Sequence, residues 1–158
     1  MKHLIVMLAA LAALAATGNA AAQVTVKDPW VRGTVAQQKA TGAFMQLEAR
    51  QDTRLVEARS PVAGAVEIHE MKMENNIMKM RAIAGLDIPA GKAVDLKPGG
   101  YHVMLLDLKE QMKEGASVPV TLVFEGKDKK RETVEIKAMV RPLAGGAAKK
   151  DDHSGHKH

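Results

Sequence analysis

The sequence contains no cysteine among its 158 residues. No disulfide can therefore stabilise the fold, and no thiolate is present to act as a nucleophile or as a metal ligand. The same absence excludes lipid attachment through a cysteine. It also excludes a blue-copper electron-transfer site, which requires a Cys thiolate. In an oxidising compartment, a soft metal site is better built from thioethers, because a pair of thiols there would risk oxidation.

Aromatic residues are also scarce, since they make up only 3% of the chain. The net charge is +5, and basic residues are interspersed with acidic ones along most of the sequence. Nucleic-acid-binding proteins usually concentrate basic side chains on one face, often beside aromatic residues that stack on bases. The composition therefore argues against nucleic acid as a partner.

No apolar run is long enough to span a membrane. The longest covers residues 4–16, follows Lys2 and His3, and leads into small residues that include Ala20 and Ala22. A transmembrane helix needs about 20 apolar residues, whereas a short run between a basic start and a small-residue end is typical of a secretory signal peptide. We predict a signal peptide over residues 1–22, cleaved near Gln23. The mature protein is then expected in the periplasm, without stable membrane insertion.

The rest of the chain is dominated by short segments in which apolar and polar residues alternate, as in residues 118–124 and 133–139. A period of two is typical of half-buried β-strands, and turn-forming residues such as those at 98–100 separate the segments. Residues 107–113 are the one stretch that resembles a helical turn. Strands are predicted over residues 24–27, 30–33, 42–49, 54–59, 65–73, 77–83, 92–96, 101–106, 117–124 and 132–140.

Many short strands without a long amphipathic helix favour an all-β fold, an antiparallel β-sandwich or barrel in one domain over residues 23–142. After Pro142 the sequence becomes rich in glycine, alanine, lysine and histidine. Such a composition cannot bury enough apolar surface to order the backbone. We therefore expect residues 143–158 to form a flexible tail.

Methionine is unusually frequent for a chain with so few aromatic residues, with ten in total. Methionine often fills gaps in a hydrophobic core, and this is the interpretation for Met45 and Met139. Residues 68–80 differ, because they suggest two strands joined by a turn at 74–76. Side chains alternate along a strand, so residues two apart share a face. By this rule three strands each present donors on one face: His69, Met71 and Met73; Met78 and Met80; His102 and Met104.

Two imidazoles and two thioethers can thus converge from different strands, and their chemistry selects the metal. Thioether sulfur is a soft, neutral donor that suits Cu(I), whereas Mg²⁺ and Ca²⁺ prefer oxygen. Zn²⁺ sites in proteins use thiolate, imidazole and carboxylate rather than thioether. A donor set without charge also stabilises a monovalent ion relative to a divalent one.

The spacing of these histidines and methionines resembles a known motif. His69, ten intervening residues, Met80, twenty-one intervening residues and then His102-Val-Met104 closely resemble the copper-binding motif of the PCu(A)C family of periplasmic copper chaperones. Further segments that look like family signatures lie at residues 28–32, 41–45, 62–71, 88–91, 96–104 and 113–115.

This resemblance implies a cupredoxin-like Greek-key β-sandwich that binds one Cu(I) near its surface through His69, Met80, His102 and Met104. It also implies a copper chaperone rather than an enzyme, which delivers copper for assembly of the copper-A centre in cytochrome c oxidase subunit II alongside a Sco-type thioredoxin-like protein. A monomer is expected. Two alternatives stay open: copper buffering or resistance without a dedicated recipient, and a copper enzyme or redox protein.

The C-terminal tail suggests a second metal site. Its histidines and two neighbouring aspartates form a harder donor set, which favours Cu(II). Some members of the resembled family carry a His- and Met-rich C-terminal extension that takes part in copper binding. We predict an auxiliary Cu(II) site there, and the alternatives are a solvated tail with incidental histidines or a cloning remnant. The candidate ligands are His153, His156 and His158.

Overall fold

The computed structural model describes residues 23–143, and all of its regular elements are β-strands. The predicted signal peptide and the histidines of the tail lie outside the described residues, so both remain predictions. Because no helix occurs among residues 23–143, this part of the chain offers none that is long and apolar enough to cross a bilayer. The strands are β1 (Val24–Arg32), β2 (Ala40–Ala49), β3 (Thr53–Arg59), β4 (Ala63–Glu74), β5 (Ile77–Ala82), β6 (Leu86–Ile88), β7 (Val94–Leu96), β8 (His102–Leu108), β9 (Ser117–Gly126) and β10 (Arg131–Arg141).

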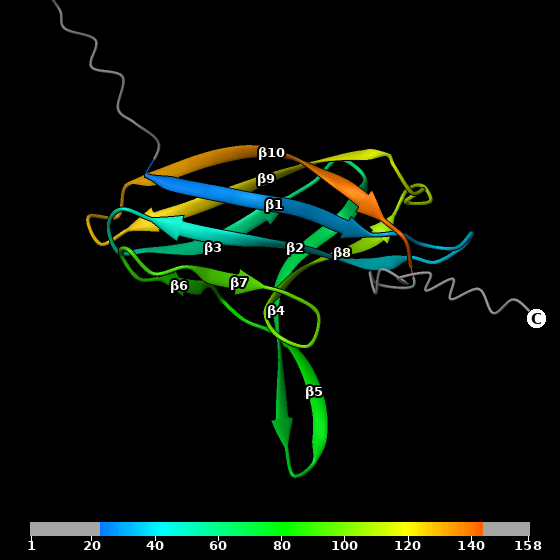
Figure 1. Ribbon diagram of the computed structural model, residues 1–158, viewed down its shortest axis with the longest axis horizontal. Helices are drawn as coiled ribbons and strands as arrows, with labels where there is room; N and C mark the ends of the chain where they lie inside the picture. Colours follow the sequence, from blue (N-terminus) through cyan, green and yellow to red (C-terminus); the bar gives the residue numbers. More distant parts are fainter. Residues whose placement is uncertain (1–22, 144–158) are drawn as a thin grey trace, which may run out of the picture.

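The strands form one continuous sheet that folds over on itself into a sandwich (Figure 1). Hydrogen bonds link them in the order β5-β4-β8-β2-β1-β10-β9-β3-β6, while β7 pairs with β2 outside this path. Only β1 and β10 run parallel; every other pair is antiparallel. The predicted all-β sandwich is confirmed.

The core lies between the two layers and consists of aliphatic side chains with one aromatic ring. Its largest fully buried side chains come from strands far apart in sequence, and they are Val31, Leu47, Leu55, Ile88, Val103, Leu105, Val120, Leu122 and Phe124. Met45 belongs to this core, as predicted. The core interpretation of Met139 is wrong, because its neighbours Ala138 and Val140 face inward and alternation turns Met139 outward, where it is 48% exposed.

Three strand predictions need correction. The two segments expected before residue 33 are one strand, β1, which continues through an irregularity between Lys27 and Trp30 where Asp28 has a φ of 48°. The short strand β6 was not predicted. Residues 107–113 form no helical turn, because β8 extends to Leu108 and the backbone of Met112 is held by a hydrogen bond from its N–H to the Thr34 hydroxyl at 2.9 Å.

Strand β4 is longer than its partner β8, and the difference in length positions the candidate site. The two strands run antiparallel from the pair Ala63–Leu108 to the pair His69–His102, where β8 begins. Beyond His69, the remaining residues of β4 pair only with β5. The β4–β5 hairpin therefore projects from the body of the sandwich (Figure 1).

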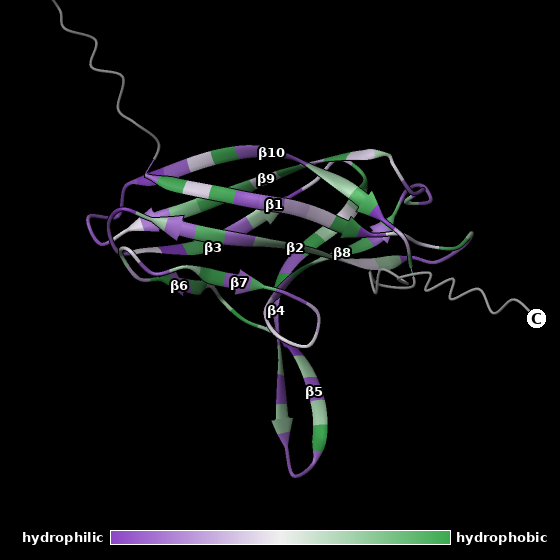
Figure 2. Cartoon of the chain, in the orientation of Figure 1, coloured by the Kyte–Doolittle hydropathy of each residue, from purple (hydrophilic) through white to green (hydrophobic). Residues whose placement is uncertain are grey.

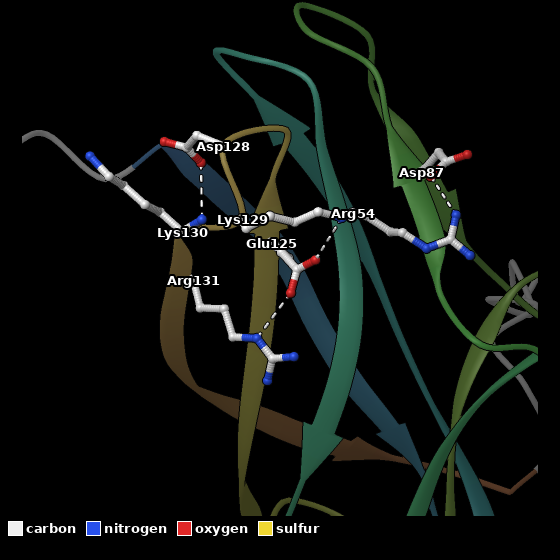
Figure 3. Close-up of polar contacts among 7 residues, drawn as sticks. All are labelled: Arg54, Asp87, Glu125, Asp128, Lys129, Lys130 and Arg131. Atoms are coloured by element: carbon white, nitrogen blue, oxygen red, sulfur yellow. Dashed lines mark hydrogen bonds and ion pairs between the residues drawn. The ribbon is translucent and has the colours of Figure 1, made fainter.

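Ion pairs lie on the surface around the β9–β10 turn and strands β3 and β6 (Figure 3). Arg54 contacts Asp87 at 2.7 Å, and Arg131 contacts Glu125 at 3.1 Å. Exposed pairs of this kind contribute little to stability, at most about 1 kcal/mol each. Burial of the core, rather than these contacts, stabilises the fold.

We predict that Leu105→Ala lowers the free energy of unfolding by about 2–5 kcal/mol, because Leu105 is fully buried on β8 and its truncation leaves a cavity. Val35→Ala is the control, since Val35 is 56% exposed and such surface changes usually stay within about 0.5 kcal/mol. Chemical denaturation measures both. Equal stability of the two variants would contradict this account of the core.

Candidate metal centre

The inward residues of β4 and β8 determine which way the candidate ligands point. Ile68 on β4 and Val103 and Leu105 on β8 face the core. Because side chains alternate, His69, His102 and Met104 lie on the outer face of the sheet. His69 is directly opposite His102 in the register, and their ring centroids are 5.5 Å apart.

Both imidazoles are buried although they lie on the outer face, with 9% of His69 and 5% of His102 exposed. An aromatic cluster covers part of that face: Phe44 lies 6.1 Å from the ring of His102 and 4.5 Å from that of Trp30, between centroids. The Phe44 ring lies over Gly42, where an added Cβ would stand 2.7 Å from its Cζ atom. Glycine at position 42, opposite Met104, therefore leaves room for this ring.

One nitrogen of each imidazole is already held by an oxygen acceptor. Nε2 of His69 lies 2.6 Å from the Glu67 carboxylate, and Nδ1 of His102 lies 3.1 Å from the Gly100 carbonyl. In the tautomer that carries its proton on the contacted nitrogen, each ring donates a hydrogen bond to that oxygen. The other nitrogen of each ring then keeps a lone pair for a metal, and Nδ1 of His69 is buried without any hydrogen-bond partner. Oxygen acceptors that orient a ligating histidine in this way are usual at metal sites.

The Gly100 carbonyl also ties the hairpin to His102. It accepts a hydrogen bond from the backbone N–H of Met71 at 3.1 Å, in addition to the contact with the imidazole. Gly99 adopts a φ of +85° in this turn, a conformation that favours glycine. The turn thus fixes the ring of His102 relative to the first residues of the hairpin.

The thioethers adjoin the histidines around a surface pocket of about 280 Å³. Met80 lies opposite Met71 on the hairpin and is 48% exposed, while Met104 is half-buried on β8. The pocket is lined by Met71, Met80, His102 and Met104. Three of the four predicted ligands therefore share one pocket. The fourth predicted ligand, His69, does not line this pocket but lies beside His102, which does.

The electrostatics of the pocket favour neutral imidazole. Burial lowers the pKa of His102 below its ordinary value of 6.5, and the nearby His69 and Arg32 lower it further, against the opposing effect of the Gly100 carbonyl. His102 is therefore uncharged at neutral pH, which is the form that binds a metal. Among residues 23–143, no three His, Asp or Glu side chains are grouped so that they could hold a metal ion.

Glu70 and Tyr101, the sequence neighbours of His69 and His102, lie on the opposite face from the ligands, since both line a separate pocket with Ile83 and Leu86. Sequence reasoning did not identify every residue around the site. It missed Glu67, although alternation puts residues 67 and 69 on one face. It also missed Phe44 and Gly42, which reach the site only because β2 pairs with β8. No local pattern signals that pairing.

Two comparisons of sequence identify relatives. Residues 24–140 match the family model LpqE-like, described as "Putative lipoprotein LpqE-like". The chain is 32% identical over 108 residues to "Putative lipoprotein Lxx21020" of Leifsonia xyli subsp. xyli (strain CTCB07), covering 68% of this chain and 65% of that relative's length. It is 29% identical over 123 residues to "Uncharacterized protein RP573" of Rickettsia prowazekii (strain Madrid E), covering 74% of this chain and 68% of that protein.

Solved structures with the same fold include an apo PCuAC domain and a Cu(I)-bound protein. The apo PCuAC domain of PmoF1 superimposes with a TM-score of 0.62 at 24% identity, covering 77% of this chain and 95% of that domain. The Cu(I) form of DR1885 from Deinococcus radiodurans gives a TM-score of 0.59 at 30% identity, covering 79% of this chain and 83% of that protein. The chain therefore belongs to the LpqE-like family and has the cupredoxin-like fold of PCuAC domains, in agreement with the resemblance carried by its motif.

Proposed function

We propose that this protein is a non-enzymatic copper chaperone that holds one Cu(I) between His69, Met80, His102 and Met104. The observation that carries the proposal is the pair of buried imidazoles, whose ring centroids are 5.5 Å apart, each with one nitrogen held by an oxygen acceptor so that its other nitrogen is left for a metal. Nδ1 of His69 is buried without any hydrogen-bond partner. Two such nitrogens beside a pocket lined by Met80 and Met104 form a soft, neutral donor set.

The donor chemistry supports Cu(I) over other metals. Neutral imidazole and thioether contribute no charge, so they favour a monovalent ion, and thioether sulfur is a poor ligand for hard cations. The Cu(I) form of the Deinococcus relative supports copper as the cargo. We assign the tail histidines His153, His156 and His158 to an auxiliary Cu(II) site on the separate ground of their harder donors.

The exposure of the ligands supports transfer rather than storage. Met80 is 48% exposed on the hairpin, whereas both histidines are buried on the sandwich. A partner can therefore replace the thioether of Met80 first while the imidazoles still hold the ion. Transfer would proceed by such ligand exchange to the thiolates of a recipient, for which we propose the copper-A centre of cytochrome c oxidase subunit II or a Sco-type protein outside the cytoplasm.

We predict one tight Cu(I) equivalent in a competitive titration of the purified protein, and a large loss of affinity in His102→Ala and Met104→Ala. Removing a residue that only orients a metal ligand commonly lowers metal affinity by about 10–100-fold. Loss of His102, itself a buried ligand, should therefore lower Cu(I) affinity by more than about 100-fold. Met139→Leu is the matched control, because Met139 is exposed on β10 and is not among the residues that line the pocket. Affinity indifferent to His102 and Met104 would refute the ligand assignment.

Glu67 is expected to affect Cu(I) binding by orienting the imidazole of His69. We predict that Glu67→Ala weakens Cu(I) binding about 10–100-fold, because the imidazole loses the acceptor that orients it. Glu67→Gln should recover part of the affinity, since its amide oxygen can still accept from Nε2. The same titration measures both variants, and equal affinities for Ala and Gln would show that orientation by this hydrogen bond is unimportant.

Delivery is tested in the organism that encodes the chain. Deletion of the gene should lower the copper-A content of purified cytochrome c oxidase, and the wild-type gene should restore it while His102→Ala does not. Copper sensitivity with an unchanged oxidase copper content would instead favour the buffering role.

A further inference from the structure

The β4–β5 hairpin separates its side chains into two chemically distinct faces. In the register of the two strands, Met71 lies opposite Met80 and Met73 lies opposite Met78. Side chains opposite one another share a face, so all four thioethers lie on the face that also carries His69. The other face carries Glu70, Lys72, Glu74, Ile77, Lys79 and Arg81.

The charged face is held together by ion pairs. Arg81 contacts Glu70 at 2.7 Å and Glu74 at 3.6 Å, and Lys79 contacts Glu74 at 3.2 Å. These contacts keep the carboxylates and the cations of the hairpin on the side away from the methionines. Beyond His69, the face of Met73 and Met78 therefore offers only neutral sulfur donors on the hairpin.

Core packing does not account for the two outer methionines. Met73 is 58% exposed and Met78 is 42% exposed, whereas the core methionines Met45 and Met112 are each 3% exposed. A methionine acts as a gap filler only where neighbours surround it. Figure 2 shows apolar residues along β5, outside the body of the sandwich.

We propose that Met73 and Met78, with Met71 as a third donor, form a second Cu(I) site made only of thioethers. Directly opposed residues place their Cβ atoms about 4.5–5.5 Å apart, and diagonal neighbours about 7–8 Å apart, within reach of long side chains. Three flexible thioethers can therefore close around one soft ion. This site lacks imidazole, so it binds more weakly than the site at His69 and His102.

Its position gives the second site a role in transfer, an inference that rests on the proposed function. Met73 and Met78 lie two residues further out than Met71 and Met80, a distance of about 7 Å along the strands. Met71 lies closer to the sandwich than Met73 does, and it lines the same pocket as Met80 and Met104. A Cu(I) ion at the end of the hairpin thus reaches the main site by exchanging one thioether at a time.

The test is an anaerobic Cu(I) titration against a weak competing chelator, in the full protein with His153, His156 and His158 all replaced by alanine. Two equivalents are expected, one tight and one at least about tenfold weaker. Met73→Leu with Met78→Leu should abolish the weaker one and leave the tight one unchanged, because leucine keeps the size and apolarity of the side chain. Met139→Leu should change neither. A single tight equivalent in the starting protein, or a weaker equivalent that survives the double leucine variant, would overturn the proposal.

A second variant separates this proposal from the function proposed for the main site. In His69→Ala with His102→Ala, the weaker equivalent should persist, and X-ray absorption at the copper edge should show sulfur neighbours without imidazole. Imidazole nitrogen in that spectrum would overturn the thioether site. If the starting protein instead binds only the weak, sulfur-coordinated equivalent, the ligand assignment of the main site fails while the hairpin site stands.

Discussion

The candidate site depends on the register in which β4 pairs with β8. That register places His69 opposite His102, and through side-chain alternation it also directs Ile68, Val103 and Leu105 into the core. A slip of one residue would turn the imidazoles inward and the aliphatic side chains outward, at the cost of most of the apolar burial on these strands. The two histidines are therefore held together by hydrophobic burial on the opposite face of the same strands. Their polar contacts with Glu67 and Gly100 orient the rings but do not determine where they lie.

The unequal lengths of the same two strands divide the site between a rigid part and a projecting part. His69, His102 and Met104 stand on the sandwich, while Met80 stands on a strand that pairs with β4 alone. The Gly100 carbonyl joins the two parts, since it accepts from both the Met71 backbone and the His102 ring. A donor set built in this way can keep two ligands fixed while another exchanges. That property suits a protein that both binds an ion and releases it.

Much of this arrangement follows from the sequence, because a period of two is a local signal. Alternation correctly placed His69 with Met71 and His102 with Met104, and the turn at 74–76 correctly joined the strands of the hairpin. The features that sequence reasoning missed depend mostly on contacts between residues far apart in the chain. Phe44 and Gly42 reach the site through the pairing of β2 with β8, and residues 107–113 avoid a helix because Thr34, 78 positions away, binds the backbone of Met112. No pattern within a short window carries such information. Glu67 is different, since its face could have been deduced from its spacing to His69.

The absence of cysteine gives the proposed transfer its direction. A thiolate adds charge attraction to soft-donor bonding, so a recipient with cysteine ligands binds Cu(I) more tightly than neutral imidazole and thioether do. Three thioethers at the end of the hairpin would in turn bind more weakly than two imidazoles with two thioethers. Copper entering at Met73 and Met78 would then meet progressively stronger donor sets on its way through Met80 to a partner's thiolates.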